Sequence, residues 1–406
     1  MPTPATGATG PVAVWLTAAG WAEAARRRWG QAWLVTPEGT FGPEEARALA
    51  TAPRPPARPR QGWRRRVPAL LGTAKKDLRD LLRAWRFRDA ALDGPWASAR
   101  LAFVVQHHEI FQRAGFRAAR AARVPLVLFV DAPLVWEAAQ WGVRRPGWGR
   151  LLERLGESPQ LRAADLVACV SEEVAQQAIR LGARPERVLV TPCSVDVETF
   201  SPQVDGHGVR ERYGLGARTV VGWVGSFRRF HGVDLLLRAF SQVQRAHPEL
   251  ALLLVGDGFE RPQAERIAAE LGMTPAVFTG AVPHTEVASH MAAMDVAVVV
   301  DPGHAEFHYS PLKVREYLAC GLAVVAPRSG QLAELLGDAG AALLVPPGDE
   351  PALAGALRDL AGDPDLRQIL GTRGRELMER SGTWHHQIAR VEAALEDLAS
   401  RGEIRR

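Results

Sequence analysis

The sequence has few cysteines and no long hydrophobic run. Its three cysteines, Cys169, Cys193 and Cys320, lie far apart in the 406 residues and form no C-x-x-C pair. This pattern excludes a disulfide framework and a zinc site, and it predicts buried free thiols in a reducing compartment. No apolar run approaches the roughly 18 residues that a membrane-spanning helix needs. The N-terminus has no basic segment followed by an apolar one, so we expect no signal peptide. We therefore expect a cytoplasmic protein.

The sequence also offers little that would bind a metal ion or a nucleic acid. Its one D-x-D sequence, Asp363–Pro364–Asp365, lies in a polar turn between helices, where we expect it to cap a helix. We predict no metal site and no tightly bound cofactor. The net charge of +5 is concentrated in residues 54–88, which contain twelve Lys or Arg residues and two acidic ones. No recognisable nucleic-acid-binding module surrounds this stretch, so we expect no nucleic-acid partner.

Short apolar runs alternate with amphipathic stretches along the chain. A chain of 406 residues is long enough for two domains. In the second half, the runs are apolar on both faces, as in parallel strands that helices cover on both sides. This alternation predicts an α/β fold with doubly wound parallel sheets. We expect strands at residues 12–16, 32–36, 101–106, 126–131, 166–170 and 187–191, and then at 219–227, 250–255, 277–280, 295–300, 322–326 and 342–345.

These elements predict an N-terminal domain over residues 1–200, a C-terminal domain over residues 201–380, and a last helix within residues 381–406. Open α/β sheets bind ligands beyond the carboxyl ends of their strands. Two such sheets facing each other would bind a donor on one side and an acceptor on the other. This arrangement suggests a transferase.

The strongest local pattern is FHYSPLKVREYLACGLAVVA, residues 307–326. Ser310 is a good N-cap, and Pro311 suits the first helical position. The helix would direct its free N–H groups and the positive end of its dipole at an anion. Lys313 adds charge in the first turn, and Glu316, one turn later, could accept hydrogen bonds from ribose hydroxyls. The alternative is a capped amphipathic helix with a surface Lys–Glu pair.

This segment resembles the donor-binding segment of the family-4 retaining glycosyltransferases. The resemblance implies the GT-B fold, in which two Rossmann-like domains face each other and a C-terminal helix crosses back to the N-terminal domain. The family's helix carries Glu-x7-Glu and then A-x-G-x-x-V-V. Here Glu316 matches the second Glu, which binds the ribose, and His308 replaces the first, so both are assigned to the reacting centre. The donor contacts implied in this segment are Tyr309, Ser310, Pro311, Leu312, Lys313 and Glu316.

Three further segments resemble the same family, in the same order. The segment VGWVGSFRRFHG, residues 221–232, resembles its first nucleotide-domain strand and loop. The family usually has an Arg and a Lys for the diphosphate where this chain has Ser226 and His231. The segments LLLVGDGFE and FTGAVPHTEVASHMAAMDVAVV match its V-G-x-G turn and its F-x-G-x-V. The donor-binding residues implied here are Gly225, Ser226, Arg228, His231, Gly256 and Gly258, with Val282 and His284 near the nucleobase.

The N-terminal half resembles the family's acceptor domain more faintly. Gly20 follows the first expected strand, where the family has a close turn near acceptor and donor. In VPLVLFVDAP, Asp131 fills a position where many members carry a His beside the reacting sugar, and His107 and His108 end the preceding strand. Asp131 near either His would suit acid–base or hydrogen-bonding work. The alternative is that Asp131 caps the next helix and the histidines only line a cleft.

The resemblance implies retaining transfer of a sugar from a UDP- or GDP-sugar to a glycan, lipid-linked or small-molecule acceptor. The acceptor hydroxyl would attack from the face that the nucleotide leaves, and a donor phosphate oxygen would help take its proton. The replaced diphosphate residues and His308 leave two alternatives open. One is a degenerate, non-catalytic GT-B nucleotide-binding protein, and the other is a GT-B nucleotide-sugar epimerase.

The basic segment, residues 64–88, predicts an amphipathic helix. At helical spacing its apolar residues form one stripe, and its cations lie off that stripe. Such a helix can rest on an anionic membrane, which would make the protein peripheral on the inner face of the membrane. The alternative is that the stripe packs on the sheet of the acceptor domain. The stripe consists of Leu70, Leu71, Ala74, Leu78, Leu81, Leu82 and Trp85.

Overall fold

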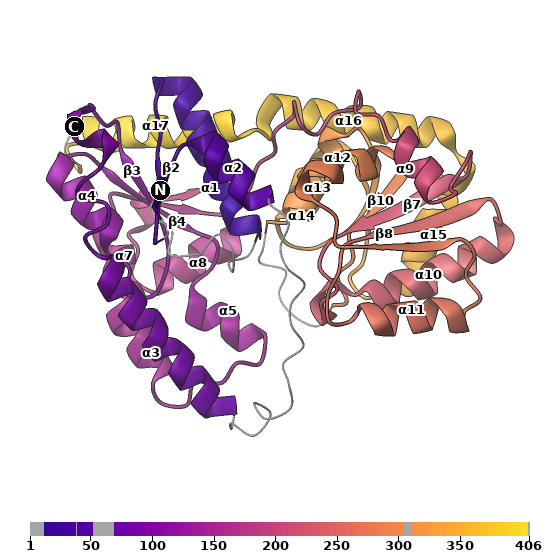
Figure 1. Ribbon diagram of the computed structural model, residues 1–406, viewed down its shortest axis with the longest axis horizontal. Coiled ribbons are helices and arrows are strands. Elements are labelled where there is room, and N and C mark those ends of the chain that lie inside the picture. The colour runs from indigo at the N-terminus through magenta and orange to yellow at the C-terminus, as the bar shows by residue number, and fades with distance from the viewer. Residues whose placement is uncertain (1–11, 38, 52–68, 304–309, 405–406) are drawn as a thin grey trace. The chain divides into compact units, whose positions relative to one another are not determined.

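The structure is a computed structural model that describes residues 12–37, 39–51, 69–303 and 310–404 (Figure 1). The chain divides into two compact units. Unit 1 contains the residues up to Cys193, together with Ser310 and the residues from Trp384 onward. Unit 2 contains the residues from Ser194 to Thr383, apart from the short segment at Ser310. The predicted calls at His308 and Tyr309 lie outside the described residues.

Unit 1 is built on a parallel sheet with the strand order β3-β4-β5-β6, beside a separate antiparallel β1-β2 hairpin. The strands of the parallel sheet are mostly buried apolar residues, as in β4, where all five residues are buried. The elements of unit 1 are α1 (Val12–Trp29), β1 (Leu34–Thr36), β2 (Gly39–Phe41), α2 (Pro43–Thr51), α3 (Ala69–Phe87), β3 (Val104–His107), α4 (Ala114–Ala122), β4 (Leu126–Val130), α5 (Leu134–Gln140), α6 (Gly149–Leu152), the π-helical turn η3 (Glu153–Glu157), α7 (Ser158–Ala163), β5 (Leu166–Cys169), α8 (Glu172–Arg180), β6 (Val188–Val190) and α17 (Trp384–Ser400).

The strand expected at residues 12–16 is wrong, because this segment begins helix α1. Trp15, Ala18, Ala19 and Ala22 are buried at helical spacing. The Ala-, Glu- and Arg-rich sequence that follows favours a helix over its whole length. Gly20 therefore lies inside a helix and not in a turn.

Gly20 is required by close packing within unit 1. A Cβ atom at this position would lie 2.4 Å from Nε1 of Trp384, the first residue of α17. The indole of Trp384 also packs on that of Trp21, with the ring centroids 6.1 Å apart. The last helix, predicted within residues 381–406, is thus present as α17, and it packs on α1 within unit 1.

Unit 2 is built on a six-stranded parallel sheet with the strand order β12-β11-β10-β7-β8-β9. The chain winds from β7 in one direction and from β10 in the other, so the sheet is doubly wound. Helices α10 and α11 lie on one face, and α12 and α13 lie on the other (Figure 1). The elements are α9 (His207–Arg212), β7 (Thr219–Val224), α10 (Val233–Ala246), β8 (Leu250–Val255), α11 (Arg261–Glu270), β9 (Ala276–Gly280), α12 (His284–Ala292), β10 (Val296–Val298), α13 (Leu312–Ala319), β11 (Ala323–Pro327), α14 (Gly330–Ala339), β12 (Leu343–Val345), α15 (Glu350–Gly362) and α16 (Pro364–Ser381).

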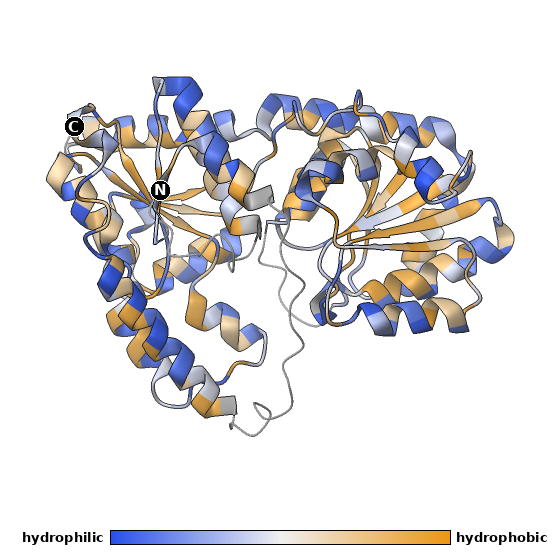
Figure 2. Cartoon of the chain, viewed as in Figure 1, coloured by the Kyte–Doolittle hydropathy of each residue, from blue (hydrophilic) through white to orange (hydrophobic). Residues whose placement is uncertain are grey.

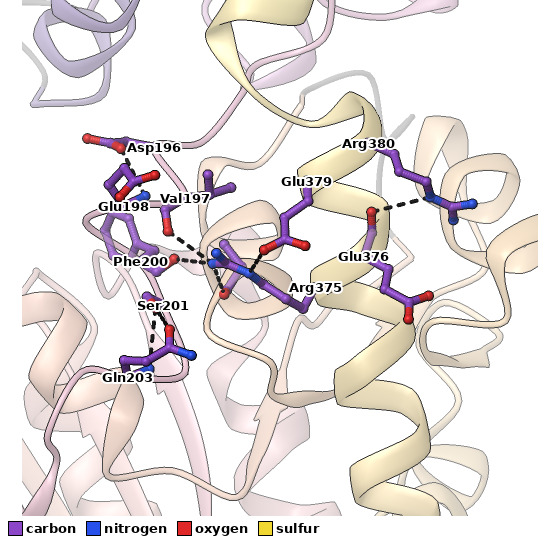
Figure 3. A network of polar contacts seen from close by, with 11 residues as sticks. Asp196, Val197, Glu198, Phe200, Ser201, Gln203, Arg375, Glu376, Glu379 and Arg380 are labelled. Atoms are coloured by element: carbon purple, nitrogen blue, oxygen red, sulfur yellow. Dashed lines mark hydrogen bonds and ion pairs between the residues drawn. The ribbon is translucent and has the colours of Figure 1, made fainter.

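Arg375 of α16 ties together separate segments of unit 2. Its Nη1 donates to the carbonyl oxygens of Val197, Phe200 and Ala319 at 2.8–3.0 Å, and its Nε contacts Glu379 at 2.7 Å (Figure 3). Ala319 is the last residue of α13. This network therefore anchors the carboxyl end of the helix that carries the predicted donor residues.

Several other expectations can be compared with the described residues. Of the twelve expected strands, the eleven after the first appear as β1 and β3 to β12. The three cysteines are free and buried, and the carboxylate of Asp363 caps α16 by accepting from the N–H of Leu366 at 2.8 Å. Among the described residues, no group of side chains could hold a metal ion, and no helix is long and apolar enough to cross a membrane.

The apolar stripe of α3 does not pack on the sheet, so that alternative is wrong. Leu71, Leu78 and Trp85 are about three-fifths exposed, at 61%, 58% and 60%. A different face of the helix, which includes Ala84 and Phe87, is buried instead. Figure 2 shows hydrophobic and hydrophilic residues alternating along the visible side of α3.

A buried ion pair fixes the rotation of α3. Asp77, on the inward face of the helix, accepts hydrogen bonds from Arg145 Nε at 2.9 Å and from Trp148 Nε1 at 2.9 Å. The side chains of Asp77 and Arg145 are only 8% and 6% exposed. Because Asp77 must face inward to keep these bonds, the apolar stripe is left facing solvent.

Candidate active site

The predicted donor residues of unit 2 gather where the winding of its sheet reverses. Strands β7 and β10 are neighbours in the sheet, and the chain leaves them in opposite directions. In open α/β sheets this switch point, at the carboxyl ends of the strands, is where ligands bind. The loop from Gly225 to His231 follows β7, and Lys313 of α13 approaches the same loop.

Glycines let the turns after β7 and β8 approach closely. A Cβ atom on Gly256 would lie 1.9 Å from the carbonyl oxygen of Gly225, and Gly256 has a φ of 129°. A Cβ atom on Gly258 would lie 2.6 Å from the backbone of Phe227. The predicted donor-site glycines Gly225, Gly256 and Gly258 thus bring two backbone turns together.

Lys313 lies over the aromatic ring of Trp223, beside Gly225. Its Nζ is 4.6 Å from the ring centroid, a distance typical of a cation–π contact. A Cβ atom on Gly225 would lie 2.9 Å from the same Nζ. The lysine therefore has a defined place against the turn that the sequence assigns to the diphosphate.

The Lys313–Glu316 pair has strongly shifted pKa values. Burial lowers the pKa of Lys313 to about 7, although the charge of Glu316 opposes the shift. Burial also raises the pKa of Glu316 to about 7, and here Lys313 opposes the shift. Both residues are half-buried at the molecular surface, so a ligand can still reach them. Such shifted groups are typical of functional sites.

His231 does not replace the charge of the lysine that the family usually has. Its Nδ1 lies 2.5 Å from the carbonyl oxygen of Ser226. Because a carbonyl oxygen only accepts, Nδ1 must carry the proton in this hydrogen bond. Burial, and then the positive charge of Lys313, lower the pKa of His231 to about 3. His231 is thus neutral near pH 7, whereas Lys313 of α13 places a cationic side chain against this loop.

The predicted cap of the donor helix is wrong in detail. Helix α13 begins at Leu312, and its N-cap is Pro311, which offers no side-chain hydrogen bond. The hydroxyl of Ser310 instead accepts from the backbone N–H of Cys193 at 3.2 Å. The helix is held to the sheet further along, where the N–H of Val224 donates to the hydroxyl of Tyr317 at 2.7 Å.

The other predicted donor residues have different surroundings. Arg228 is exposed, and Val282 is half-buried in the segment before α12. His284 begins α12 and packs edge-on against Phe200, with the ring centroids 6.0 Å apart.

In unit 1, the predicted acid–base residues lie together at the carboxyl ends of β3 and β4. His107 Nε2 is 2.6 Å from Asp131 Oδ2. The N-cap of α5 is Pro133, with no side-chain cap bond, so Asp131 binds His107 and does not cap the helix. Burial alone would lower the pKa of His107, but the charges of Asp131 and Glu109 outweigh it and raise the pKa above its ordinary value.

His108 has a different, fully buried partner. Its Nε2 is 3.3 Å from Oε1 of Glu157, and neither side chain is exposed. The same oxygen accepts from the N–H of Leu134 at 2.6 Å. Since Leu134 begins α5 just after Asp131, this pair joins the ends of β3 and β4.

Sequence reasoning missed Glu109 and Glu157. Glu109 lies two residues after His107 and is 4.0 Å from its Nδ1. An acidic residue just after a histidine at a strand end could have been noticed as a signal. Glu157 could not have been found in this way, because it reaches His108 from the π-helical turn η3, and 49 residues separate the two.

Comparison with known proteins matches both units to glycosyltransferase families. Residues 218–363 match the family described as "Glycosyl transferases group 1", and residues 17–199 match "Glycosyltransferase Family 4". The chain is similar to a GDP-mannose-dependent alpha-(1-6)-phosphatidylinositol monomannoside mannosyltransferase of Mycolicibacterium smegmatis. The two sequences are 31% identical over 334 residues, and the aligned region covers 77% of this chain and 83% of that protein. The chain belongs to the family 4 glycosyltransferases. It is accordingly a transferase that uses a nucleotide-sugar donor.

Other relatives and solved structures are similar over different lengths. A D-inositol 3-phosphate glycosyltransferase of Kribbella flavida is 31% identical over 61% of this chain and 60% of its own length. Anabaena HepE with UDP and glucose has a TM-score of 0.66 at 19% identity, over 97% of this chain and 98% of that one. Sucrose-phosphate synthase of Thermosynechococcus elongatus has a TM-score of 0.65 at 20% identity, over 97% and 94%. These structures show the GT-B fold for this family 4 chain.

Proposed function

We propose that this family 4 glycosyltransferase moves a sugar from a UDP- or GDP-sugar to a hydroxyl of its acceptor with retention of configuration. The observation that carries the proposal is Lys313, held against the Gly225 turn at the switch point of the unit 2 sheet, with Glu316 three residues later on the same helix. A cation beside closely packed glycine turns suits a diphosphate. A carboxylate one helical turn away suits ribose hydroxyls.

The proposed reaction needs no protein nucleophile. The bond between the anomeric carbon and the phosphate oxygen breaks, and the acceptor oxygen bonds to the same face of that carbon. The proton of the acceptor hydroxyl passes to the leaving phosphate oxygen. Lys313 stabilises the negative charge that develops on the diphosphate, while Asp131 and His107 orient hydroxyl groups near the reacting sugar. Donor-binding roles for Ser226, Arg228, Val282 and His284 remain part of this proposal.

The reaction is tested by incubating the chain with UDP- and GDP-sugars and candidate acceptors. We expect release of the nucleoside diphosphate together with a glycoside product whose anomeric configuration matches that of the donor, as measured by NMR. An inverted product would contradict the proposed mechanism. Conversion of the donor to its epimer without an acceptor would indicate an epimerase instead.

Glu316→Gln is expected to weaken nucleoside diphosphate binding by about 1.5–3 kcal/mol, the range for hydrogen bonds to a charged group. The amide keeps the shape of the side chain but has no charge, and its NH2 group cannot accept a ribose hydrogen bond as a carboxylate oxygen can. Titration calorimetry with UDP and GDP measures the change. Glu350→Gln is a matched control on another helix of unit 2, and unchanged affinity in Glu316→Gln would remove this residue from the site.

We also propose that the exposed face of α3 binds an anionic lipid surface. Six large apolar residues of one helix face solvent, and Lys75, Arg79 and Arg86 are exposed beside them. An apolar face flanked by cations is the composition of helices that lie in the plane of a membrane surface. The phosphatidylinositol mannoside named for the Mycolicibacterium relative is a lipid, which supports a lipid-linked acceptor here.

The double variant Leu78→Ser/Leu82→Ser is expected to bind vesicles at least about tenfold more weakly, because each buried leucine contributes about 1.5–3 kcal/mol. Sedimentation with vesicles of phosphatidylglycerol and phosphatidylcholine measures the binding, at low and at high salt. Ile369→Ser, at an exposed residue of α16 in unit 2, is the control. Absence of binding by the wild-type chain would contradict the membrane proposal.

A further inference from the structure

A buried imidazole lies between two accessible carboxylates in unit 1. The side chain of His107 is only 7% exposed, whereas those of Asp131 and Glu109 are 40% and 32% exposed. Asp131 Oδ2 is 2.6 Å from Nε2, and Glu109 Oε1 is 4.0 Å from Nδ1. Two carboxylates that reach solvent therefore lie near the two nitrogens of one buried ring.

The ring leaves one polar atom unsatisfied. Among the described residues, His107 Nδ1 is buried and has no hydrogen-bond partner, and the gap to Glu109 is too long for a hydrogen bond. Buried polar groups are normally hydrogen-bonded. The unpaired Nδ1 and the nearby Glu109 carboxylate are therefore polar groups that a bound ligand could satisfy.

The backbone around both carboxylates is held firmly. The carbonyl of Glu109 accepts from Gln160 Nε2 at 2.7 Å, and Gln160 also accepts from Gln106 at 3.0 Å. On the other side, Glu157 holds the N–H of Leu134, just after Asp131, at 2.6 Å. The two carboxylates are therefore pre-positioned, which lowers the entropy cost of binding.

The charges at this site favour a neutral ligand. One histidine faces two acidic side chains, so the site has one group that can become positive and two that can become negative. The charge of Lys76 in α3 also acts on Glu109. Lys76 lies 3.4 Å from Asp80, so this ion pair adds no net charge to the site. Carboxylates accept hydrogen bonds from hydroxyl groups, whereas a phosphate would be repelled.

We infer that Glu109, His107 and Asp131 form the acceptor site for a neutral polyol, with Glu109 as a specificity-determining residue that accepts hydrogen bonds from its hydroxyls. This inference rests on the proposed function, since it names the acceptor class of the same reaction. The inference also places any phosphate group of the acceptor away from the three side chains that bind the polyol hydroxyls.

The test compares neutral polyols with their monophosphates as acceptors, using myo-inositol, glycerol and the phosphate ester of each. Release of nucleoside diphosphate from the donor is measured. We expect wild-type kcat/KM to be at least about tenfold higher for the neutral compound of each pair. Glu109→Gln should raise the KM for the polyol about tenfold or more, while the KM for the donor stays unchanged. The ratio of kcat/KM for the neutral polyol to that for its monophosphate should also become smaller.

Glu186→Gln, at an exposed residue of unit 1, is the control for the loss of one charge. Equal or better use of the monophosphate by the wild-type chain would overturn the inference. So would an unchanged polyol KM in Glu109→Gln, or failure of every neutral polyol to stimulate release while the donor still binds. Nucleoside diphosphate binding by the wild-type chain is measured separately by thermal unfolding. If the wild-type chain does not bind a nucleoside diphosphate, that result counts against the proposed function instead.

Discussion

Replacing Asp131 by asparagine is expected to reduce kcat by about 10²-fold or more, because the hydroxyl groups that Asp131 and His107 orient lose their reactive geometry. The carboxylate holds His107 at 2.6 Å and raises its pKa. An asparagine fills the same volume but has no charge to stabilise the imidazolium. Steady-state kinetics with a saturating donor measures the change.

The same variant should bind nucleoside diphosphates as the wild-type chain does, because the donor residues belong to unit 2. Asp359→Asn, at an exposed residue of α15, controls for the loss of a carboxylate. A kcat for Asp131→Asn within threefold of wild type would remove Asp131 and His107 from the reacting centre.

Replacing Lys313 by methionine is expected to weaken nucleoside diphosphate binding by about 10²-fold or more, since truncating a charged, desolvated partner costs about 2–5 kcal/mol. Methionine keeps the apolar part of the side chain against Trp223 but has no charge. Titration calorimetry measures the loss. Lys75→Met, at an exposed lysine of α3, should have no such effect, and a Lys313→Met affinity near that of wild type would contradict the assignment.

Nucleoside diphosphate binding through Lys313 is also expected to depend on pH. Burial gives the free lysine a pKa of about 7, and a bound diphosphate favours the charged form and raises that pKa. Binding above pH 7 must therefore take up a proton. Affinity should fall by up to about tenfold per pH unit between pH 7 and 9, and this slope should vanish in Lys313→Met. Equal slopes for the two proteins would show that another group controls binding.

The fold was largely predictable because its strands are apolar on both faces. Strands such as β8, buried in all six residues, have no competing helical pattern. The first segment failed because VAVWL is apolar enough for a strand, while the sequence after it, which favours a helix, decides the outcome. Local sequence alone also could not reveal that α3 turns its apolar stripe outward, since Asp77 is held by Arg145, 68 residues away.

The proposed donor residues are easier to group from the sequence than the proposed acceptor residues, for a physical reason. Lys313 and Glu316 lie three residues apart on one helix, and the glycines that fit the turns together are local signals. The acceptor groups come from separate strands, so that only the fold joins His107 with Asp131, 24 residues later. The charge of His231 was also unpredictable, because its lowered pKa depends on burial and on Lys313.

The central claim is that unit 2 binds a nucleoside diphosphate through Lys313. It is tested most directly by thermal unfolding of the wild-type chain and of Lys313→Met with UDP, GDP and other nucleoside diphosphates. At a ligand concentration of 100 times Kd, the linkage of about 2.7 kcal/mol predicts a rise of about 5–10 °C for the wild-type chain. We expect that rise with UDP or GDP for the wild-type chain and no such rise for Lys313→Met. No shift of the wild-type chain with any nucleotide would contradict the central claim.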